Sequence, residues 1–249
     1  MNLGNPIAIG NTAKVYLYEN KIVKIFKADL PDTESLYEAH KQNFAYLSGL
    51  SVPKVLDVTK IDGKQAIIME YIKGRTLGDL LTENMEQGEY YMNISIDVQR
   101  NIHMVSASSL EPMTEKLRRQ INSAPNLDGR YKSILIKKLD SMIFENKLCH
   151  GDFHLYNLIT SDNKVTIIDW VDSSNGDIRA DIYRTYLLYS QFSVELAEMY
   201  LRLYCEKSGL SKQEIFQWAP IIAGARLSEN VSSEKTERLM SIINYYSPL

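Results

Sequence analysis

The sequence predicts an α+β protein in two parts: a small N-terminal antiparallel sheet with one helix, and a larger, mostly helical C-terminal part. Up to about Ile72, short runs of β-branched and aromatic residues are separated by turn-forming residues. Beyond Gly74 the apolar residues recur at helical spacing. This change of pattern divides the chain into an N-terminal lobe, residues 1–72, and a C-terminal lobe, residues 73–249.

The N-terminal lobe is expected to hold two hairpins and a helix between them. The predicted strands are residues 15–18, 22–26, 55–61 and 64–69. Asp62-Gly63, between the last two, is a dipeptide that favours two-residue hairpin turns. The helix opens at Pro31-Asp32-Thr33-Glu34 and is expected to place Tyr37, Phe44 and Leu47 on one side.

The C-terminal lobe is expected to consist of helices joined by loops. Helical periodicity predicts helices at residues 94–107, 112–122, 129–145, 178–191, 194–207, 212–224 and 233–246. The gaps at residues 86–92 and 123–128 are predicted to be surface loops. Ser211-Lys212-Gln213-Glu214 has the spacing of a capping box, which marks the start of one of these helices.

The overall composition is that of an ordinary globular protein, with 45% hydrophobic and 24% charged residues. A net charge of −3 and the lack of a basic block argue against nucleic acid as a partner. Cys149 and Cys205 are too few for a disulfide framework and fit a reducing compartment. The N-terminus lacks a signal pattern, and no apolar run approaches the roughly 18 residues of a membrane span. We therefore expect a cytoplasmic protein without a membrane partner.

The most informative segment begins at His150-Gly151-Asp152 and continues to Asn157. Asp152 and Asn157 are five residues apart, so one loop could present a carboxylate to a substrate hydroxyl and a carboxamide to a metal ion. Asp169 would be the second metal ligand. Residues 158–160 and 165–168 flank the turn-prone Ser161-Asp162-Asn163-Lys164. Such a hairpin would bring Asn157 and Asp169 to one Mg²⁺.

A nucleotide-binding segment is predicted near the N-terminus. Gly10, Asn11 and Thr12 could form a loop whose backbone N–H groups cover phosphates, although one glycine is also explained by a plain turn. Lys24 lies in an apolar strand and could pin the phosphates or simply occupy an exposed alternate position. Glu38, on the following helix, could hold the lysine charge in place. Glu34, one turn earlier, is a rival for that role.

Together these motifs resemble the aminoglycoside phosphotransferase and choline kinase group, within the protein-kinase-like fold. The resemblance rests on Gly10-Asn11-Thr12-Ala13, Lys24, Glu38, the connector Met69-Glu70-Tyr71-Ile72, the run from His150 to Asn157, Asp169, and Gly176-Asp177 followed by Asp181. It implies a two-lobed protein-kinase-like fold with ATP or GTP between the lobes. The adenine would bond to backbone near Glu70 and Ile72, and Ile168 would form one of the apolar walls around it.

The resemblance also implies roles for the polar residues. Asp152 would orient the acceptor hydroxyl and take its proton, while Asn157 and Asp169 would hold Mg²⁺. Lys24 would contact the α- and β-phosphates. Asp181 would brace the catalytic loop, although it could also be an ordinary carboxylate in the first turn of a helix.

The histidines of the run allow a second interpretation. His150, Asp152 and His154 could be metal ligands, with His103 as a fourth, but a zinc site would leave Asn157 and the N-terminal lobe unexplained. We expect His150 and His154 to hydrogen-bond the backbone and shape the loop. His103 is expected to be a core histidine with a satisfied ring.

The length of the segment after Asp169 bears on the acceptor. Only eleven residues separate Asp169 from Asp181, too few for the long activation segment on which protein kinases bind a peptide. A small hydroxylated acceptor is therefore favoured. Asp172, Asp177 and Glu229 could meet a cationic acceptor, although Arg226 could instead pair with Glu229.

The function predicted from the sequence is ATP- and Mg²⁺-dependent transfer of the γ-phosphoryl group to a hydroxyl of a small molecule. Aminoglycoside-like, choline-like and sugar acceptors all remain open, as does the oligomeric state. One alternative is a non-catalytic nucleotide-binding module that signals through a partner. A protein kinase is the other.

Overall fold

The computed structural model describes residues 3–10, 12–162 and 164–248. The chain forms two compact units. The first comprises Met1–Met85 with Leu155–Val171, and the second Glu86–His154 with Asp172–Leu249. The first unit thus joins residues 155–171 to the N-terminal part of the chain. The lobe boundary after Ile72 stays a prediction.

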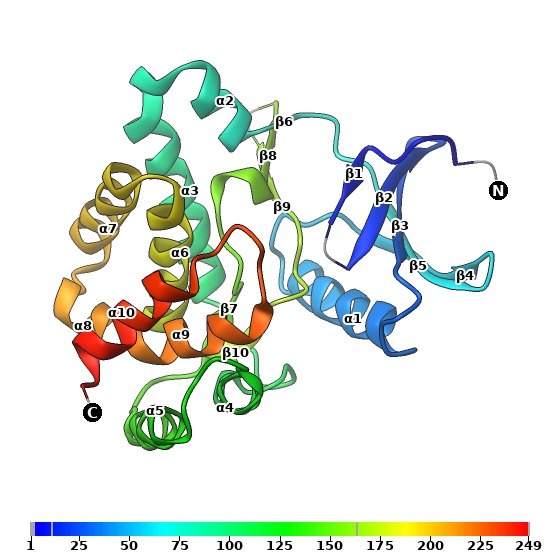
Figure 1. Cartoon of the computed structure of the whole chain (residues 1–249). Helices are drawn as coiled ribbons and strands as arrows, with labels where there is room; N and C mark the ends of the chain where they lie inside the picture. The colour runs from blue at the N-terminus through cyan, green and yellow to red at the C-terminus, as the bar shows by residue number, and fades with distance from the viewer. Residues whose placement is uncertain (1–2, 11, 163, 249) are drawn as a thin grey trace. The chain divides into compact units, whose positions relative to one another are not determined.

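The main sheet of the first unit has the strand order β1-β2-β3-β5-β4, with every neighbouring pair antiparallel (Figure 1). Its strands are β1 (Ala8–Ile9), β2 (Ala13–Tyr18), β3 (Lys21–Phe26), β4 (Val55–Ile61) and β5 (Lys64–Glu70). Both predicted hairpins are present, while the short β1 is an addition to the four predicted strands. Asp62 and Gly63 have φ angles of 49° and 77°, the left-handed conformation that this turn requires.

Helix α1 (Glu34–Leu47) contacts β4 and β5 with a face that was not predicted. Tyr37 and Leu47 are largely exposed, so the expected apolar side is wrong. The buried residues are Ser35, Glu38, Ala39, Gln42 and Ala45. Small and polar residues occupy this face because several of them bond to the sheet and its loops; for example, Gln42 Nε2 donates to Pro53 O over 2.7 Å.

A second, three-stranded sheet completes the first unit. It has the order β6-β8-β9, formed by β6 (Arg75–Thr76), β8 (Leu158–Ser161) and β9 (Lys164–Ile167). The predicted hairpin after Asn157 is therefore present. Helix α2 (Leu77–Glu83) follows β6 and was not predicted, although Thr76 caps it by accepting from Asp79 N. A side chain on Gly78 would collide with the Tyr156 ring, so α2 and the 3-10 turn η2 (Leu155–Asn157) approach closely only because this residue is glycine.

The second unit is mostly helical. After the 3-10 turn η1 (Met85–Gln87), its elements are α3 (Gly88–His103), α4 (Met113–Ser123), α5 (Gly129–Ser141), β7 (Lys147–Cys149), β10 (Ser174–Gly176), α6 (Ile178–Phe192), α7 (Val194–Ser208), α8 (Lys212–Phe216), α9 (Ala219–Arg226), η3 (Leu227–Glu229) and α10 (Thr236–Tyr246). Strands β7 and β10 form an antiparallel pair. Helix α6 contacts α7, α8 and α9, so it lies at the centre of this unit (Figure 1).

Two predictions for this unit were wrong. Residues 88–92 belong to α3 rather than to a surface loop. The predicted helix 212–224 is two helices, α8 and α9. Pro220 has no N–H group to donate within a continuous helix, but it is tolerated in the first turn of α9, where the N–H groups have no partner in the helix. Over the described parts of the chain, we find no helix with the length and apolarity that a membrane crossing requires.

Candidate functional site

In the first unit, a lysine lies between two carboxylates. Lys24 Nζ on β3 is 2.6 Å from Glu38 Oε1 on α1 and 3.6 Å from Asp169 Oδ1 after β9. The lysine is not an exposed alternate residue, since its side chain is only 12% exposed. Glu38, which is buried, takes the position for which Glu34 was a rival.

This cluster has one positive and two negative groups. Burial would lower the pKa of Lys24, but Glu38 and Asp169 outweigh that effect and raise it. Burial raises the pKa of Glu38. Lys24 lowers this pKa, but not enough to cancel the effect of burial, and repulsion from Asp169 raises it further. The cluster thus sets one lysine against two carboxylates, of which Glu38 is the more deeply buried.

Asn157 and Asp169 flank one end of the β8-β9 hairpin. Leu158 pairs with Ile167, and Ile168 N donates to Asn157 O over 3.0 Å. This strand register fixes the backbone positions of the two candidate ligands at the same end of the hairpin. Asp169 Oδ1 is buried and has no hydrogen-bond partner in the described chain. Oxygen ligands of this kind suit Mg²⁺, which completes its shell with water and phosphate oxygens. The residues present therefore fit a magnesium ion.

The predicted phosphate loop lies between β1 and β2. Gly10 N donates to Ala13 O over 2.9 Å, and Thr12 O accepts from Lys27 N over 2.8 Å. Asn11 lies outside the described residues. Contact of this loop with phosphate stays a prediction.

The expected adenine-binding connector, Met69 to Ile72, begins within β5, which ends at Glu70. Glu70 N donates to Lys54 O, which leaves this part of the Glu70 backbone occupied. Ile72 and Ile168 are both half-buried. An adenine contact by Glu70 would therefore need its carbonyl group rather than its N–H.

The run from His150 to Asn157 begins in the second unit, directly after β7. Gly151 has a φ of 83°, and a side chain there would collide with the carbonyl oxygen of Asp172, so only glycine fits. Gly151 N donates to Asp181 Oδ1 over 2.7 Å, and Arg184 Nε donates to Gly151 O over 3.1 Å. Two side chains of helix α6 thus bond to the backbone N–H and the carbonyl group of Gly151, the residue before Asp152.

Asp181 itself lies in a completely buried polar network. Its Oδ2 contacts His103 Nε2 at 2.9 Å and accepts from Gln99 Nε2 over 3.2 Å, while His103 Nδ1 contacts the Tyr204 hydroxyl. Burial would raise the pKa of Asp181, but His103 and the Gly151 N–H outweigh it and lower it to about 2. His103 is therefore engaged within the core, which removes it from the alternative zinc site.

Asp152 is close to two histidines of the same run. His154 Nε2 lies 3.6 Å from Asp152 Oδ2, and His150 Nδ1 accepts from Asp152 N over 3.3 Å. Burial would raise the pKa of Asp152, but His154 and Arg184 outweigh it, so the pKa is well below its usual range. Asp152 is thus an anion at neutral pH and can accept a hydrogen bond from a hydroxyl group.

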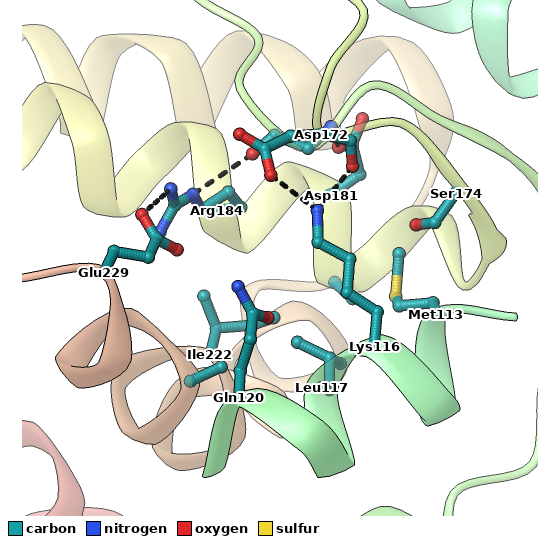
Figure 2. A pocket seen from close by; sticks show the side chains of 13 residues that line it. Met113, Lys116, Leu117, Gln120, Asp172, Ser174, Asp181, Arg184, Ile222 and Glu229 are labelled. Carbon is teal, nitrogen blue, oxygen red and sulfur yellow. Dashed lines mark hydrogen bonds and ion pairs between the residues drawn. The ribbon is translucent and has the colours of Figure 1, made fainter. Parts of the chain in front are cut away.

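A small cavity opens beside this loop, entirely within the second unit (Figure 2). Its lining combines charged, polar and apolar residues: Met113, Lys116, Leu117, Gln120, Gly151, Asp172, Ser174, Ala180, Asp181, Arg184, Ile222, Ala225 and Glu229. Two of the predicted acceptor residues, Asp172 and Glu229, are therefore brought together.

Each of these two carboxylates has a cationic partner. Lys116 Nζ donates to Asp172 Oδ1 over 2.7 Å, and Arg184 Nη2 donates to Glu229 Oε2 over 2.8 Å. Arg226 also pairs with Glu229, the second alternative allowed by the sequence. Burial would raise the pKa of Asp172, but Lys116 and Arg184 outweigh it and lower it. Neither carboxylate is an isolated negative charge.

Asp177 is not part of this group. It caps α6 by accepting from Arg179 N over 2.8 Å, and its other oxygen accepts from the Trp218 indole over 2.9 Å. The Asp177 side chain is almost fully buried in these bonds, and its contact with a substrate stays a prediction.

Sequence reasoning missed Lys116, Gln120 and Arg184. Arg184 had a usable signal, since it stands three residues after Asp181 on a predicted helix and so shares its face. Lys116 and Gln120 had none, because their neighbours in the cavity come from distant parts of the chain.

Comparison with known proteins now decides the family. A model described as the phosphotransferase enzyme family, APH, matches residues 4–218. This chain belongs to the phosphotransferase enzyme family. Among curated relatives, the phosphotransferase is 24% identical to the protein LicA homolog of Mycoplasma capricolum subsp. capricolum, over 84% of this chain and 87% of the relative.

Solved structures confirm the expected kinase-like fold of this phosphotransferase. A thermostable mutant of aminoglycoside phosphotransferase APH(4)-Ia matches with a TM-score of 0.74 and 13% identity, over 98% of this chain and 95% of that one. A choline/ethanolamine kinase family protein from Mesorhizobium loti matches with a TM-score of 0.63 and 13% identity, over 98% and 90%. The resemblance stated from the motifs is thus confirmed.

Proposed function

We propose that this phosphotransferase moves the γ-phosphoryl group of ATP, or of GTP, to a hydroxyl group of a small molecule in the cytoplasm, with Mg²⁺. The observation that supports this most directly is the Lys24 cluster, where one lysine serves two carboxylates and an oxygen of Asp169 is left for a metal ion. Similar enzymes support it as well, since APH(4)-Ia has been crystallised with ADP and hygromycin B.

On the nucleotide side, Lys24 would contact the phosphates while Glu38 fixes its position. The backbone at Gly10 and Thr12 would cover the phosphates. Asn157 and Asp169 would hold Mg²⁺, which when bound neutralises charge on the phosphate oxygens.

Asp152 would act on the acceptor. Because its pKa is low, it is a weak base whose main contribution is to orient the hydroxyl oxygen toward the γ-phosphorus. This is enough for phosphoryl transfer through a loose transition state, in which little proton transfer is needed before the new bond forms. Arg184 and Asp181 keep the loop in shape through the backbone of Gly151.

The experiment that tests this function measures ADP release from ATP and Mg²⁺ across a panel of aminoglycosides, amino alcohols, sugars and amino acids. Asp152→Ala should lower acceptor-dependent turnover by about 10² to 10⁴ while leaving MgATP binding within about twofold, because the residue acts on the acceptor. Asp140→Ala, a change of an exposed aspartate on α5, is the matched control and should behave as wild type.

The outcomes separate the alternatives. Normal turnover by Asp152→Ala would show that the catalytic assignment is wrong. MgATP binding without release for any acceptor would favour the non-catalytic signalling module, and phosphate transfer to protein without a small acceptor would favour a protein kinase.

A further inference from the structure

The cavity beside the catalytic loop presents unused hydrogen-bonding groups of both charges. On the positive side, Arg184 uses its Nε on Gly151 O and its Nη2 on Glu229, so its Nη1 has no partner among the described residues. On the negative side, Glu229 accepts only through Oε2 and Asp172 only through Oδ1 within the described chain. One oxygen of each carboxylate is therefore left for a ligand.

Gln120 lies between the two ion pairs. Its side chain extends from α4 into the cavity, toward the space between the Arg184–Glu229 pair and the Lys116–Asp172 pair (Figure 2). No described residue forms a hydrogen bond with its carboxamide. A carboxamide both donates and accepts, so it can serve either end of a ligand that has two different polar groups.

The rest of the lining limits the kind of acceptor. The apolar part consists of aliphatic side chains and a thioether, such as Leu117, Ile222 and Met113, and none of the described lining residues is aromatic. Quaternary ammonium groups are typically held by the faces of aromatic rings. A polycation would bring further positive charge beside Lys116 and Arg184, which already neutralise Asp172 and Glu229.

We propose that this cavity selects a zwitterionic acceptor, a small hydroxylated amino acid, and that Gln120 contributes to its recognition. The ammonium group of the ligand would face the free oxygens of Asp172 and Glu229, and its carboxylate would face Arg184. A zwitterion adds one charge of each sign, so it leaves no buried charge unbalanced. The inference rests on the proposed kinase function for its reaction.

The position of the cavity fits that reaction. The charge of Asp152 acts on Arg184 and Asp172, which both line the cavity, so the hydroxyl end of a bound amino acid would lie near the Asp152 carboxylate. In the transfer, the hydroxyl oxygen forms a bond to the γ-phosphorus and the bond from that phosphorus to the β–γ bridging oxygen breaks. ADP leaves, and the hydroxyl proton passes to Asp152 and then to solvent.

The decisive comparison uses pairs of acceptors that differ only in a carboxylate. L-Homoserine is compared with 3-aminopropan-1-ol and L-serine with ethanolamine, by the kcat/KM of the wild-type chain. At least one amino acid should exceed its decarboxylated partner by about 100-fold, because a site that pairs with a substrate group rejects the analogue that lacks it. If the amino alcohols, choline or aminoglycosides are better acceptors, the kinase function stands and the zwitterion inference is wrong.

Binding without reaction separates the two proposals. L-2-Aminobutyrate has no hydroxyl group and cannot be phosphorylated, and propylamine is its decarboxylated partner. Calorimetry should show tighter binding of the amino acid by about tenfold or more. Such binding without ADP release for any acceptor of the panel would overturn the kinase function but support the cavity inference, whereas equal or absent binding of the two ligands would overturn the inference.

Gln120→Leu tests the specificity residue. It should raise the KM for the hydroxylated amino acid about tenfold and leave the KM for ATP within about twofold, since Gln120 has no part in the nucleotide cluster. Gln213→Leu, the same change at an exposed position on α8, should alter neither value. An unchanged acceptor KM in Gln120→Leu would remove this residue from the proposal.

Discussion

Glu38 in the first unit and Asp181 in the second are both almost fully buried carboxylates, and their pKa values shift in opposite directions. The pKa of Glu38 is raised, while that of Asp181 is lowered to about 2. Both groups suffer the same penalty of burial. They differ in their partners, because Glu38 shares a single lysine with Asp169, whereas Asp181 contacts His103, Gln99 and the Gly151 backbone.

The comparison distinguishes a binding site from a structural support. Oε2 of Glu38 and Oδ1 of Asp169 are buried without hydrogen-bond partners in the described chain, a costly arrangement that an added cation would relieve. Both oxygens of Asp181 are satisfied within the protein. An incomplete set of partners thus indicates where a ligand ion belongs, and a complete set indicates where the fold supports itself.

The largest effect should come from Lys24→Met. Among the described residues, this change removes the one cation that pairs with Glu38 and Asp169, so we expect the free energy of unfolding to fall by about 3–5 kcal/mol. Urea denaturation measures it. Lys27→Met, a change of an exposed lysine just after β3, should cost less than about 0.5 kcal/mol. A loss below about 1 kcal/mol in Lys24→Met would show that the cluster is not under-compensated.

The contribution of Asp181 should depend on pH with a defined sign. Its pKa in the folded state is about 2, below the ordinary 3.8. At pH values above 3.8, the charged form of Asp181 therefore stabilises the folded state. This stability, about 2 kcal/mol, is lost as the pH falls toward 2.

Urea denaturation between pH 5 and about 2 tests this sign by comparing wild type with Asp181→Asn. Asp181→Asn should be less stable than wild type at pH 5, and the gap should narrow as the pH falls. A gap that stays constant would contradict the assignment of the low pKa to Asp181.

The smallest effect should come from the pair that lines the cavity. Lys116 and Asp172 are partly exposed, so a double-mutant cycle with Lys116→Met and Asp172→Asn should give a coupling of about 1 kcal/mol. The more exposed pair of Arg118 and Asp140 is the control and should give about 0.3 kcal/mol. Equal couplings would indicate that the cavity does not shield its ion pair from solvent.

Several features followed from sequence because they depend on local chemistry. Asp62-Gly63 set one hairpin turn, since few other residues adopt left-handed angles at two successive positions. The antiparallel pairing of β8 with β9 likewise placed Asn157 and Asp169 at one end of a hairpin. The pairing of Arg226 with Glu229 was also accessible, because residues three apart on a helix are neighbours.

The sequence by itself determined the family, three hairpins and the spacing of Asp152, Asn157 and Asp169. Only the tertiary structure decided which charges meet. It chose Glu38 over Glu34, committed Asp177 to a helix cap and paired Lys116 with Asp172, 56 residues away. The physical reason is that a charge is stabilised by whatever lies within a few ångströms, and those neighbours come from distant segments whose packing no local pattern specifies.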